Sequence, residues 1–479
     1  MSKYFGLDYG TTMSLIYSYN DGELHKECGN RSAALVLDGS NGPVLKIGNE
    51  ALDISQEATQ HHVPIESPKR SINNLDDDIN GITYRQMIET LLTDMIEQAD
   101  IDRDSHITLT IPNGYSATNY IDMYNILSSC LNKIFAHNHS IKIHLLPEPV
   151  AAALFYVLRH TEEMPDICRL VVCDIGGGTT DLCIIECQRV NARLTFEVKA
   201  LQQTVEIGGN KFDKKIEDNK LFPIGLKSIE KRIICQRLKC QLSNKDNAVE
   251  YIGEKQMNLT RDEFESYIQG YLSELFDLMR TMYKESNMAV DESWYLLPIG
   301  GSCKIIAIRQ LMQDVFQGAH QTYEEEKTIF DGVAQGAAIY SAWCAKALSL
   351  GQFEDILIKD LAPHEIQFKT ANGSWQTLVP KNSPNGTYPA SNEGNVKPLN
   401  IDEKAGGKYT VGEIKLKEAG TQGELTRVHD IPFSLRKRSK EEIILQLGVK
   451  IENGHIVKWW LKDCETGESQ IWDLESGNH

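Results

Sequence analysis

The sequence lacks the features that mark several common classes of protein. None of its eleven cysteines forms a CxxC pair, and no Cys/His pairs stand at the spacing of zinc ligands. No apolar run reaches the roughly 18 residues of a membrane-spanning helix, and no Walker A pattern GxxxxGK[ST] occurs. We therefore expect neither a zinc site, nor a transmembrane helix, nor a P-loop nucleotide site.

Basic residues are also fewer than acidic ones. The 479 residues include 49 Lys and Arg against 67 Asp and Glu, a net charge of −18. A nucleic-acid groove and an anionic membrane surface both call for basic surface, so we expect neither as a partner. Lys3 is followed at once by the first motif, so no secretory leader is expected. We expect reduced cysteines and a cytoplasmic protein.

Two short segments of the chain have nearly the same pattern. Residues 4–16 read YFGLDYGTTMSLI, and residues 170–185 read LVVCDIGGGTTDLCII. Each is an apolar run, an Asp, a turn of Gly and Thr, and a second apolar run, which predicts a strand–turn–strand hairpin. Glycine turns bring backbone N–H groups close to an anion. The pair predicts a clamp that holds a nucleotide's phosphates from two sides; the alternative is two ordinary hairpins.

The acidic residues of these turns indicate a metal ion. Asp8 and Asp174 repel phosphate, but carboxylates beside a phosphate site can hold Mg²⁺ or its waters. Asp181 is a third carboxylate in the second turn. The turns also supply hydroxyl groups, from Thr11, Thr12, Thr179 and Thr180.

The first 347 residues or so alternate predicted strands and helices, which indicates an α/β fold. Glu148 precedes Pro149 at a strand-to-helix corner, where a carboxylate can face an active site. Residues 294–318 predict a buried strand, a Gly-Gly turn and a helix that ends at Gly318. Further helices are predicted over 84–99, 117–136, 227–243 and 260–285, and a further strand over 107–111.

Composition changes after residue 347. Residues 351–360 read GQFEDILIKD, a short apolar and acidic connector, and we assign 348–362 as an interdomain linker. Residues 363–479 contain many turn residues and alternating patterns such as EIILQLGVKI. These predict a small all-β domain, sandwich-like, after an α/β domain over residues 1–347.

In this order the motifs resemble the actin-like ATPase fold, and more narrowly the seventy-kilodalton heat-shock chaperone family (DnaK-type). The resemblance is close over residues 4–347 and looser over the tail. It implies a two-lobed domain that binds ATP or ADP with Mg²⁺ and hydrolyses ATP slowly, followed by a peptide-binding β-sandwich. The motifs that carry it are Asp8-Tyr-Gly-Thr-Thr, Glu148-Pro-Val-Ala-Ala-Ala, Asp174-Ile-Gly-Gly-Gly-Thr-Thr-Asp181, Gly208-Gly209-x-x-Phe-Asp and Gly300-Gly301-Ser302.

The resemblance also implies roles for single residues. Asp8 and Asp174 would hold Mg²⁺ through water. Lys69 would reach the γ-phosphate and position the attacking water, with Glu148 and Asp181 as acidic partners; without the resemblance, Lys69 would be taken for a solvated surface lysine. The backbone and hydroxyl contacts to nucleotide would come from Gly10, Thr11, Thr12, Gly176, Gly177, Gly178, Thr179, Gly208 and Gly209.

The adenosine contacts depart from the family pattern. The segment QRLKCQLS resembles the family's adenine-contacting helix and keeps Lys239 and Ser243, but Gln236 replaces a Glu and Cys240 a basic residue. Lys304 stands where the family has an Arg that stacks on the base, and Lys stacks less well than a planar guanidinium. We therefore expect weaker ATP affinity than in a typical member. The remaining contacts of this end would be Gly300, Gly301 and Ser302.

The tail leaves the function open. No helical segment follows Trp472, so we expect this chain to lack the family's helical lid. The expected partners are extended peptide segments and co-chaperones or exchange factors; the alternative is a β-domain that serves as a docking or regulatory module. An actin-like filament or segregation protein is a further alternative, and so is a sugar or acetate kinase of the same superfold.

Overall fold

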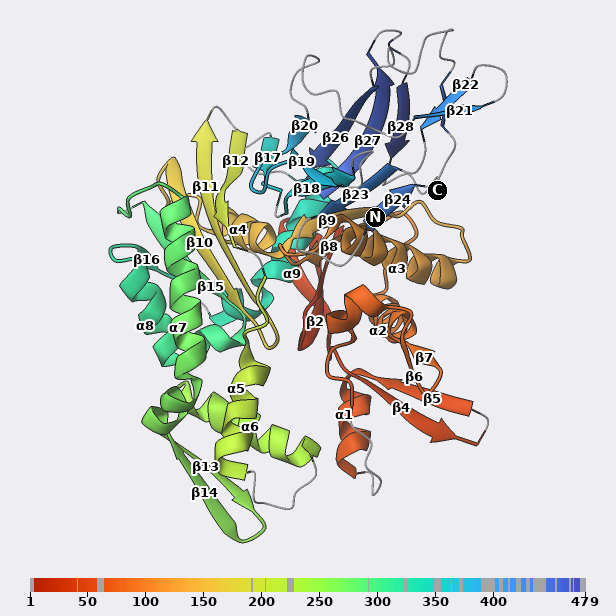
Figure 1. The fold of residues 1–479 in the computed structure, drawn as a ribbon. Helices are drawn as coiled ribbons and strands as arrows, with labels where there is room; N and C mark the ends of the chain where they lie inside the picture. The colour runs from red at the N-terminus through yellow and green to blue at the C-terminus, as the bar shows by residue number, and fades with distance from the viewer. Residues whose placement is uncertain are drawn as a thin grey trace. The chain divides into compact units, whose positions relative to one another are not determined.

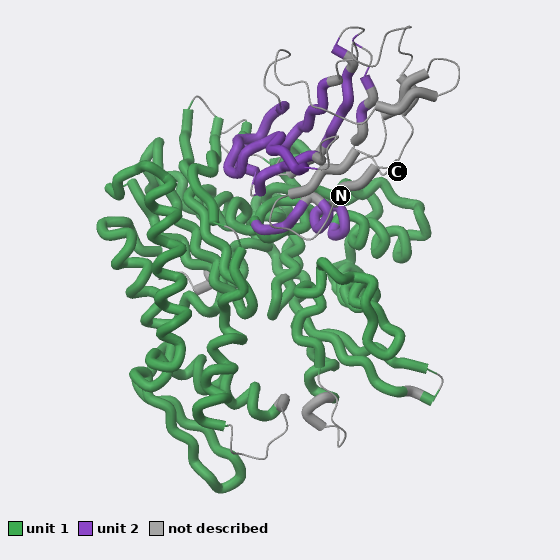
Figure 2. The backbone as a smooth tube through the Cα atoms, in the orientation of Figure 1, with its two compact units in different colours: residues 1–113, 124–357 green, residues 114–123, 358–479 purple. Residues whose placement is uncertain are grey.

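The structure is a computed structural model of the chain (Figure 1). It divides into two compact units, residues 1–113 with 124–357 and residues 114–123 with 358–479 (Figure 2). No helix within the described segments is long and apolar enough to cross a membrane. The structure describes residues 4–40, 42–57, 64–190, 193–202, 204–221, 228–291, 293–322, 326–348, 355–362, 364–369, 374–388, 401–404, 408–411, 414–418, 424–427, 431–433, 445–452, 455–464, 467 and 469–473.

Two sheets of the first unit repeat one topology. Their strand orders are β3-β2-β1-β8-β9 and β16-β15-β10-β11-β12-β17. In each, three consecutive strands form an antiparallel meander, and the first of them pairs in parallel with a later strand. The first sheet contains β1 (Tyr4–Tyr9), β2 (Met13–Asn20), β3 (Glu23–Arg31), β8 (His106–Ile111) and β9 (Lys142–Pro147). The second contains β10 (Ile167–Ile175), β11 (Thr180–Val190), β12 (Arg193–Leu201), β15 (Trp294–Ile299), β16 (His320–Gln321) and β17 (Asp355–Lys359).

The two predicted hairpins are confirmed as β1–β2 and β10–β11. The strands of the second hairpin are apolar in continuous runs because helices cover both faces of its sheet. Leu170, Val171, Val172 and Cys173 are consecutive and all fully buried. The repeated sequence pattern therefore corresponds to a half-sheet that occurs twice in the first unit.

Helices α4 (Glu148–Arg159) and α9 (Glu326–Cys344) lie between the two sheets. Helix α4 packs against strands of both sheets, and α9 packs against β1, β2, β8, β15 and α4. Their contact is close enough to require glycine, since a Cβ at Gly336 would collide with the carbonyl of Ala151. Helix α4 is buried continuously from Glu148 to Val157, so its first residue, Glu148, is held in the interior between the sheets.

Each predicted helix of the first 347 residues is present. Helix α2 (Tyr84–Gln98) begins with a capping box between Thr83 and Gln86. Its apolar residues at helical spacing are buried, namely Met87, Ile88, Leu91, Leu92, Met95 and Ile96. The other helices are α1 (Gly48–Glu57), α3 (Ala117–Phe135), α5 (Gly209–Ile216), α6 (Ser228–Leu242), α7 (Arg261–Glu285) and α8 (Ile306–Val315). Shorter elements are η1 (Pro68–Asn74), η2 (Glu217–Leu221), η3 (Gly301–Lys304), β4 (Ala34–Gly39), β5 (Gly42–Ile47), β6 (Asp78–Ile79), β7 (Ile82–Thr83), β13 (Asn247–Ile252) and β14 (Lys255–Thr260).

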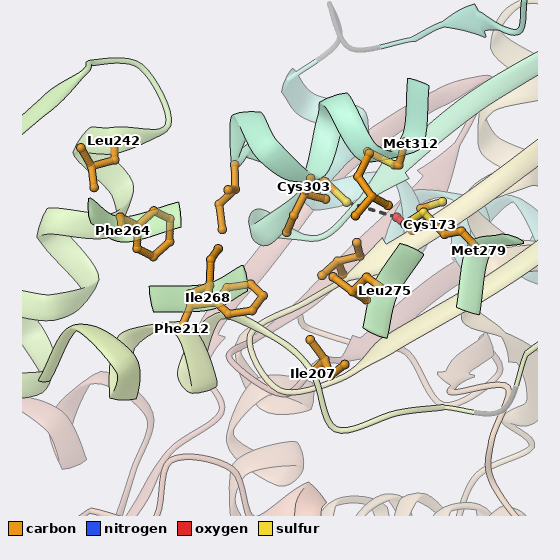
Figure 3. Packing of buried hydrophobic residues seen from close by; sticks show 14 of the residues in the cluster. Cys173, Ile207, Phe212, Leu242, Phe264, Ile268, Leu275, Met279, Cys303 and Met312 are labelled. Atoms are coloured by element: carbon orange, nitrogen blue, oxygen red, sulfur yellow. Dashed lines mark hydrogen bonds between the residues drawn. The ribbon is translucent and has the colours of Figure 1, made fainter. Parts of the chain in front are cut away.

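An extensive hydrophobic core supports the second sheet. Side chains of α5, α7 and α8 gather around it, among them Phe212, Phe264 and Met312 (Figure 3). The thiol of Cys303 in η3 donates to the backbone oxygen of Cys173 in β10 at 3.3 Å. This core fixes the ends of β10 and β15, where the second turn and the Gly-Gly turn begin.

The second unit is described in separate segments. His364 Nε2 lies 3.1 Å from the carbonyl oxygen of Gly114, which ties residues 114–123 to the strands of this unit. Its buried apolar residues include Phe368, Val379 and Trp459. Its sheets have the orders β19-β18-β23-β24, β20-β26-β27-β28 and β21-β22-β25. These strands are β18 (Ile366–Lys369), β19 (Trp375–Val379), β20 (Gly386–Tyr388), β21 (Ile401–Lys404), β22 (Lys408–Val411), β23 (Ile414–Glu418), β24 (Glu424–Arg427), β25 (Ile431–Phe433), β26 (Leu445–Glu452), β27 (His455–Asp463) and β28 (Ser469–Asp473).

The predicted linker contains a strand. Residues 349–354 of it lie outside the described part, but Asp355–Lys359 form β17 at the edge of the second sheet. Ile356 is buried there, and Asp355 pairs with Arg193 of β12 at 2.9 Å. The connector is thus attached to the half-sheet that carries the second turn. The sandwich arrangement of residues 363–479 stays a prediction, since much of that span is not described.

The contact between α4 and α9 makes a testable prediction. Gly336→Ala should lower the free energy of unfolding by about 1–3 kcal/mol, because the added methyl group overlaps the backbone of α4. The matched control is Gly270→Ala in α7, where an added Cβ meets nothing within 4 Å. That variant should gain about 0.5–1 kcal/mol from helix propensity. Urea unfolding of both variants checks the pair; equal stabilities would contradict it.

Candidate active site

The two Gly–Thr turns meet face to face in the first unit. An added Cβ at Gly177 would collide with the hydroxyl of Thr12, so only glycine permits this approach. The second turn is closed by a hydrogen bond from Gly176 N to Thr179 O at 3.0 Å. The Thr12 hydroxyl is buried and has no hydrogen-bond partner among the described residues. It therefore leaves an unused donor and acceptor at the point where the turns meet.

A cavity of about 410 Å³ opens where the turns meet. It brings together most of the residues that the sequence nominated: Asp8, Gly10, Thr11, Thr12, Lys69, Glu148, Asp174, Gly176, Gly177, Thr179, Gly209, Gln236, Lys239, Ser243, Gly300, Gly301, Ser302 and Lys304. Gly178, Asp181 and Gly208 do not line it. Asp181 lies behind the wall, 1% exposed, and accepts a hydrogen bond from the Thr204 hydroxyl. Gly208 precedes α5 as its N-cap.

Lys69 lies in the interior of the cleft, which contradicts the alternative of a solvated surface lysine. It belongs to η1 and is only 6% exposed. Its ammonium donates to the carbonyl of Tyr9 at 2.5 Å and to Glu148 Oε1 at 2.9 Å. The first turn and the start of α4 therefore fix the position of this one cation.

Burial disfavours the charged form of the carboxylates around Lys69. Burial first, and then the charge of Glu148, raises the pKa of Asp8 to about 7, although Lys69 and the Thr110 hydroxyl oppose the shift. The same two causes raise the pKa of Asp181 to about 7 and that of Asp174 well above its usual value. With Glu148, four acidic groups face one lysine. The site therefore favours binding of protons or of an added cation.

Direct metal ligands are not gathered at this site. Across the described segments, no group of three or more His, Cys, Asp or Glu side chains lies close enough to hold a metal ion. The carboxylates of Asp8 and Asp174 thus fit a cation whose remaining ligands are water and the bound ligand, the mode that Mg²⁺ favours.

The far end of the cavity is built around Lys239 of α6. Its ammonium donates to the carbonyl of Gly209 at 2.9 Å and to Asp213 Oδ2 at 2.8 Å. Burial raises the pKa of Asp213 despite this partner. The sequence did not nominate Asp213, although it is the Asp of the matched Gly-Gly-x-x-Phe-Asp pattern. Its role is visible only once α5 and α6 are packed together.

The geometry agrees with the comparisons to known proteins. The family model described as Hsp70 protein matches residues 142–404, more than half of the chain. The chain belongs to the Hsp70 family. The model described as MreB/Mbl protein matches residues 2–237. Both matches support membership of the actin-like ATPase superfamily, and the mixed α/β fold with its paired half-sheets is consistent with that membership.

Relatives of this Hsp70-family chain match it over part of their length. The chaperone protein DnaK of Trichormus variabilis and the chaperone protein dnaK1 of a Nostoc species are each 29% identical over 308 residues. Each alignment covers 57% of this chain and 42% of the relative. The chaperone protein DnaK 3 of a Synechococcus species is 27% identical over 274 residues, 52% of this chain and 39% of the relative. The match thus spans less than half of these relatives' length.

Sequence reasoning missed one cation of this Hsp70-family site. Arg31 of β3 lines the cavity and reaches Gln236 of α6, with 3.3 Å between Nη2 and Oε1. Burial lowers its pKa. Nothing in the spacing of the sequence marks it, because β3 and α6 are about 200 residues apart. A glutamine at position 236 gives it a neutral partner.

The cleft edge is bridged by a second set of polar contacts. Glu66 pairs with Arg232 of α6 and accepts a hydrogen bond from Asn210 Nδ2 at 3.2 Å. The side-chain amide of Asn210 can donate to the Glu66 carboxylate, which a carboxylate at position 210 could not do. The two walls of the Hsp70-family cleft are thus joined by an ion pair and an amide contact.

Asp181 makes a pH-dependent prediction. Its raised pKa of about 7 means that the folded chain keeps a proton that the unfolded chain loses near pH 3.8. Its stabilising contribution is full below pH 3.8 and is lost as the pH rises through 7. Asp181→Asn does not titrate, so the nucleotide-free variant should gain about 1 kcal/mol or more relative to the unchanged chain between about pH 5 and pH 8.

Urea unfolding across this pH range measures the difference. The control is Asp53→Asn, which alters an exposed carboxylate of α1. Its stability difference should not follow the curve of Asp181→Asn. A flat or falling difference for Asp181→Asn would show that the pKa of this carboxyl is not raised.

Proposed function

We propose that this chain binds ATP with Mg²⁺ in the cleft and hydrolyses it slowly. The observation that carries the proposal is the meeting of the two Gly–Thr turns beside a buried lysine. Backbone N–H groups, the Thr12 hydroxyl and the Lys69 ammonium supply donors and positive charge for phosphates. Membership of the Hsp70 family and of the actin-like ATPase superfamily supports the choice of ATP over other phosphates.

Mg²⁺ would be held through water by Asp8 and Asp174. Their raised pKa values reflect burial first and then a local excess of negative charge, which a divalent cation relieves. When bound, the ion would neutralise the charge that develops on the phosphates. The structure supplies the carboxylates for this role, and we infer no direct protein coordination.

The chain's own residues would then position the reaction. Lys69, held by Tyr9 O and Glu148, would face the terminal phosphate and the attacking water. Glu148 at the start of α4 would orient that water. The buried Asp181 would take up or release a proton close to that water. Because phosphoryl transfer depends mostly on positioning and charge neutralisation, this small set of groups is sufficient.

The nucleotide state would be passed to the C-terminal strands. Residues 355–359 pair with the half-sheet that carries the second turn, so a movement of that half-sheet reaches the connector. We propose a chaperone-like protein whose β-domain takes extended peptide segments, with co-chaperones or exchange factors as partners and a cytoplasmic location. A β-domain used for docking remains the alternative.

A second candidate rests on the MreB/Mbl match over residues 2–237. In that case ATP would control the assembly of copies of this chain. Light scattering with and without ATP discriminates between the two: an ATP-dependent rise favours assembly, and unchanged scattering with aggregation prevention favours the chaperone-like function.

Lys69 provides the test of the ATPase proposal. Lys69→Ala should reduce ATP turnover about 100-fold, since it removes a buried cation from the reacting phosphate. Asp174→Ala should reduce turnover as well. Lys133→Ala is the matched control, because Lys133 also pairs with a glutamate, Glu89, but is 57% exposed on α3. Turnover by Lys69→Ala at the rate of the control would contradict the assignment.

The connector provides the test of coupling. If nucleotide state alters the half-sheet that holds β17, protease cleavage within residues 351–360 should differ between ATP and ADP. Limited proteolysis followed by mass spectrometry locates the cut. Identical cleavage rates in ATP, in ADP and without nucleotide would exclude coupling through this segment.

A further inference from the structure

The wall of the cavity includes an aromatic side chain, Phe330. Phe330 stands near the start of α9 and is 46% exposed, although most large apolar residues of the first unit are buried. It lines the cavity that the two turns share. Ligand cavities are lined mainly by apolar and aromatic side chains, so the position of Phe330 in this cavity favours a role in binding.

The surroundings of Phe330 define which part of the cavity it occupies. The ammonium of Lys304 lies 4.5 Å from the centroid of its ring, a cation–π arrangement. A Cβ at Gly301 would lie 3.3 Å from Cε1 of Phe330, so the ring edge packs against the Gly-Gly turn. The ring therefore belongs with Gly301 and Lys304.

We propose that Phe330 is the residue on which the base of the nucleotide stacks. The inference rests on the proposed function and adds a specificity determinant to it. The face of an aromatic ring carries negative charge density and does not attract phosphate, but it stacks well on the flat, apolar face of a nucleobase. The attraction between the Lys304 ammonium and the ring helps to hold the ring in this position.

A stacking role for Phe330 raises the ATP affinity that we expect of this chain. Judged from Lys304 alone, the chain lacks a planar group for the base. Phe330 supplies that plane from a different element, α9, directly beside Lys304. Phe330 and Lys304 together would supply the flat surface and the positive charge that a single stacking guanidinium combines.

The experiment separates base binding from phosphate binding. Calorimetry measures the dissociation constants of MgADP and of inorganic tripolyphosphate for the full chain and for three variants, Phe330→Ala, Phe330→Leu and Phe330→Trp. Leucine keeps apolar bulk without an aromatic face, and tryptophan keeps the face. Tyr251→Ala is the control, since Tyr251 is 64% exposed on β13, outside the cavity. Circular dichroism confirms that each variant is folded.

We expect Phe330→Ala and Phe330→Leu to weaken MgADP binding about 5- to 150-fold, with Phe330→Trp and Tyr251→Ala close to the unchanged chain. Tripolyphosphate binding should stay within about twofold in every variant. Unchanged MgADP binding by Phe330→Ala, or an equal loss of tripolyphosphate binding, would overturn the inference alone. An unchanged chain that binds neither ATP nor ADP would instead contradict the proposed function.

Discussion

The structure depends on the burial of four acidic side chains around one lysine. Asp8, Glu148, Asp174 and Asp181 share an interior in which Lys69 pairs with Glu148 and acts on the three aspartates through its charge. Burial without enough compensating positive charge disfavours the charged form of the three aspartates and raises their pKa values. A cation that enters with an anionic ligand adds the missing positive charge. In the proposed function, Mg²⁺ would supply this charge together with the nucleotide.

The rest of the first unit serves to hold these groups in place. Each half-sheet presents its turn at the end of its first strand, and α4 and α9 lie between the half-sheets. The start of α4 carries Glu148, and α9 carries Phe330. Helices α4 and α9 pack at a contact that admits only glycine, and both contact strands of the two half-sheets. The same framework therefore fixes the chemistry and offers a route for conformational change.

The repeated sequence pattern predicted much of the fold and of the site. The residues that it did not predict were missed for physical reasons. Local signals located the hairpins, the buried face of α2 and the corner at Glu148, since these depend on neighbours in the chain. Lys69 needed the family resemblance, because its partners come from distant elements. Arg31, Asp213 and Phe330 carry no spacing signal, and only tertiary packing brings them to the cavity. The interpretation of residues 355–359 as a connector overlooked the free edge of β12, where they pair.

The central claim is that both turns hold one phosphate group at the same time. A crystal structure of the full chain with Mg²⁺ and ADP tests it most directly. The account predicts the terminal phosphate between residues 10–12 and 176–179, with Asp8 and Asp174 bonded to waters of the metal. A nucleotide that contacts only one of the two turns, or lies outside this cavity, would contradict it.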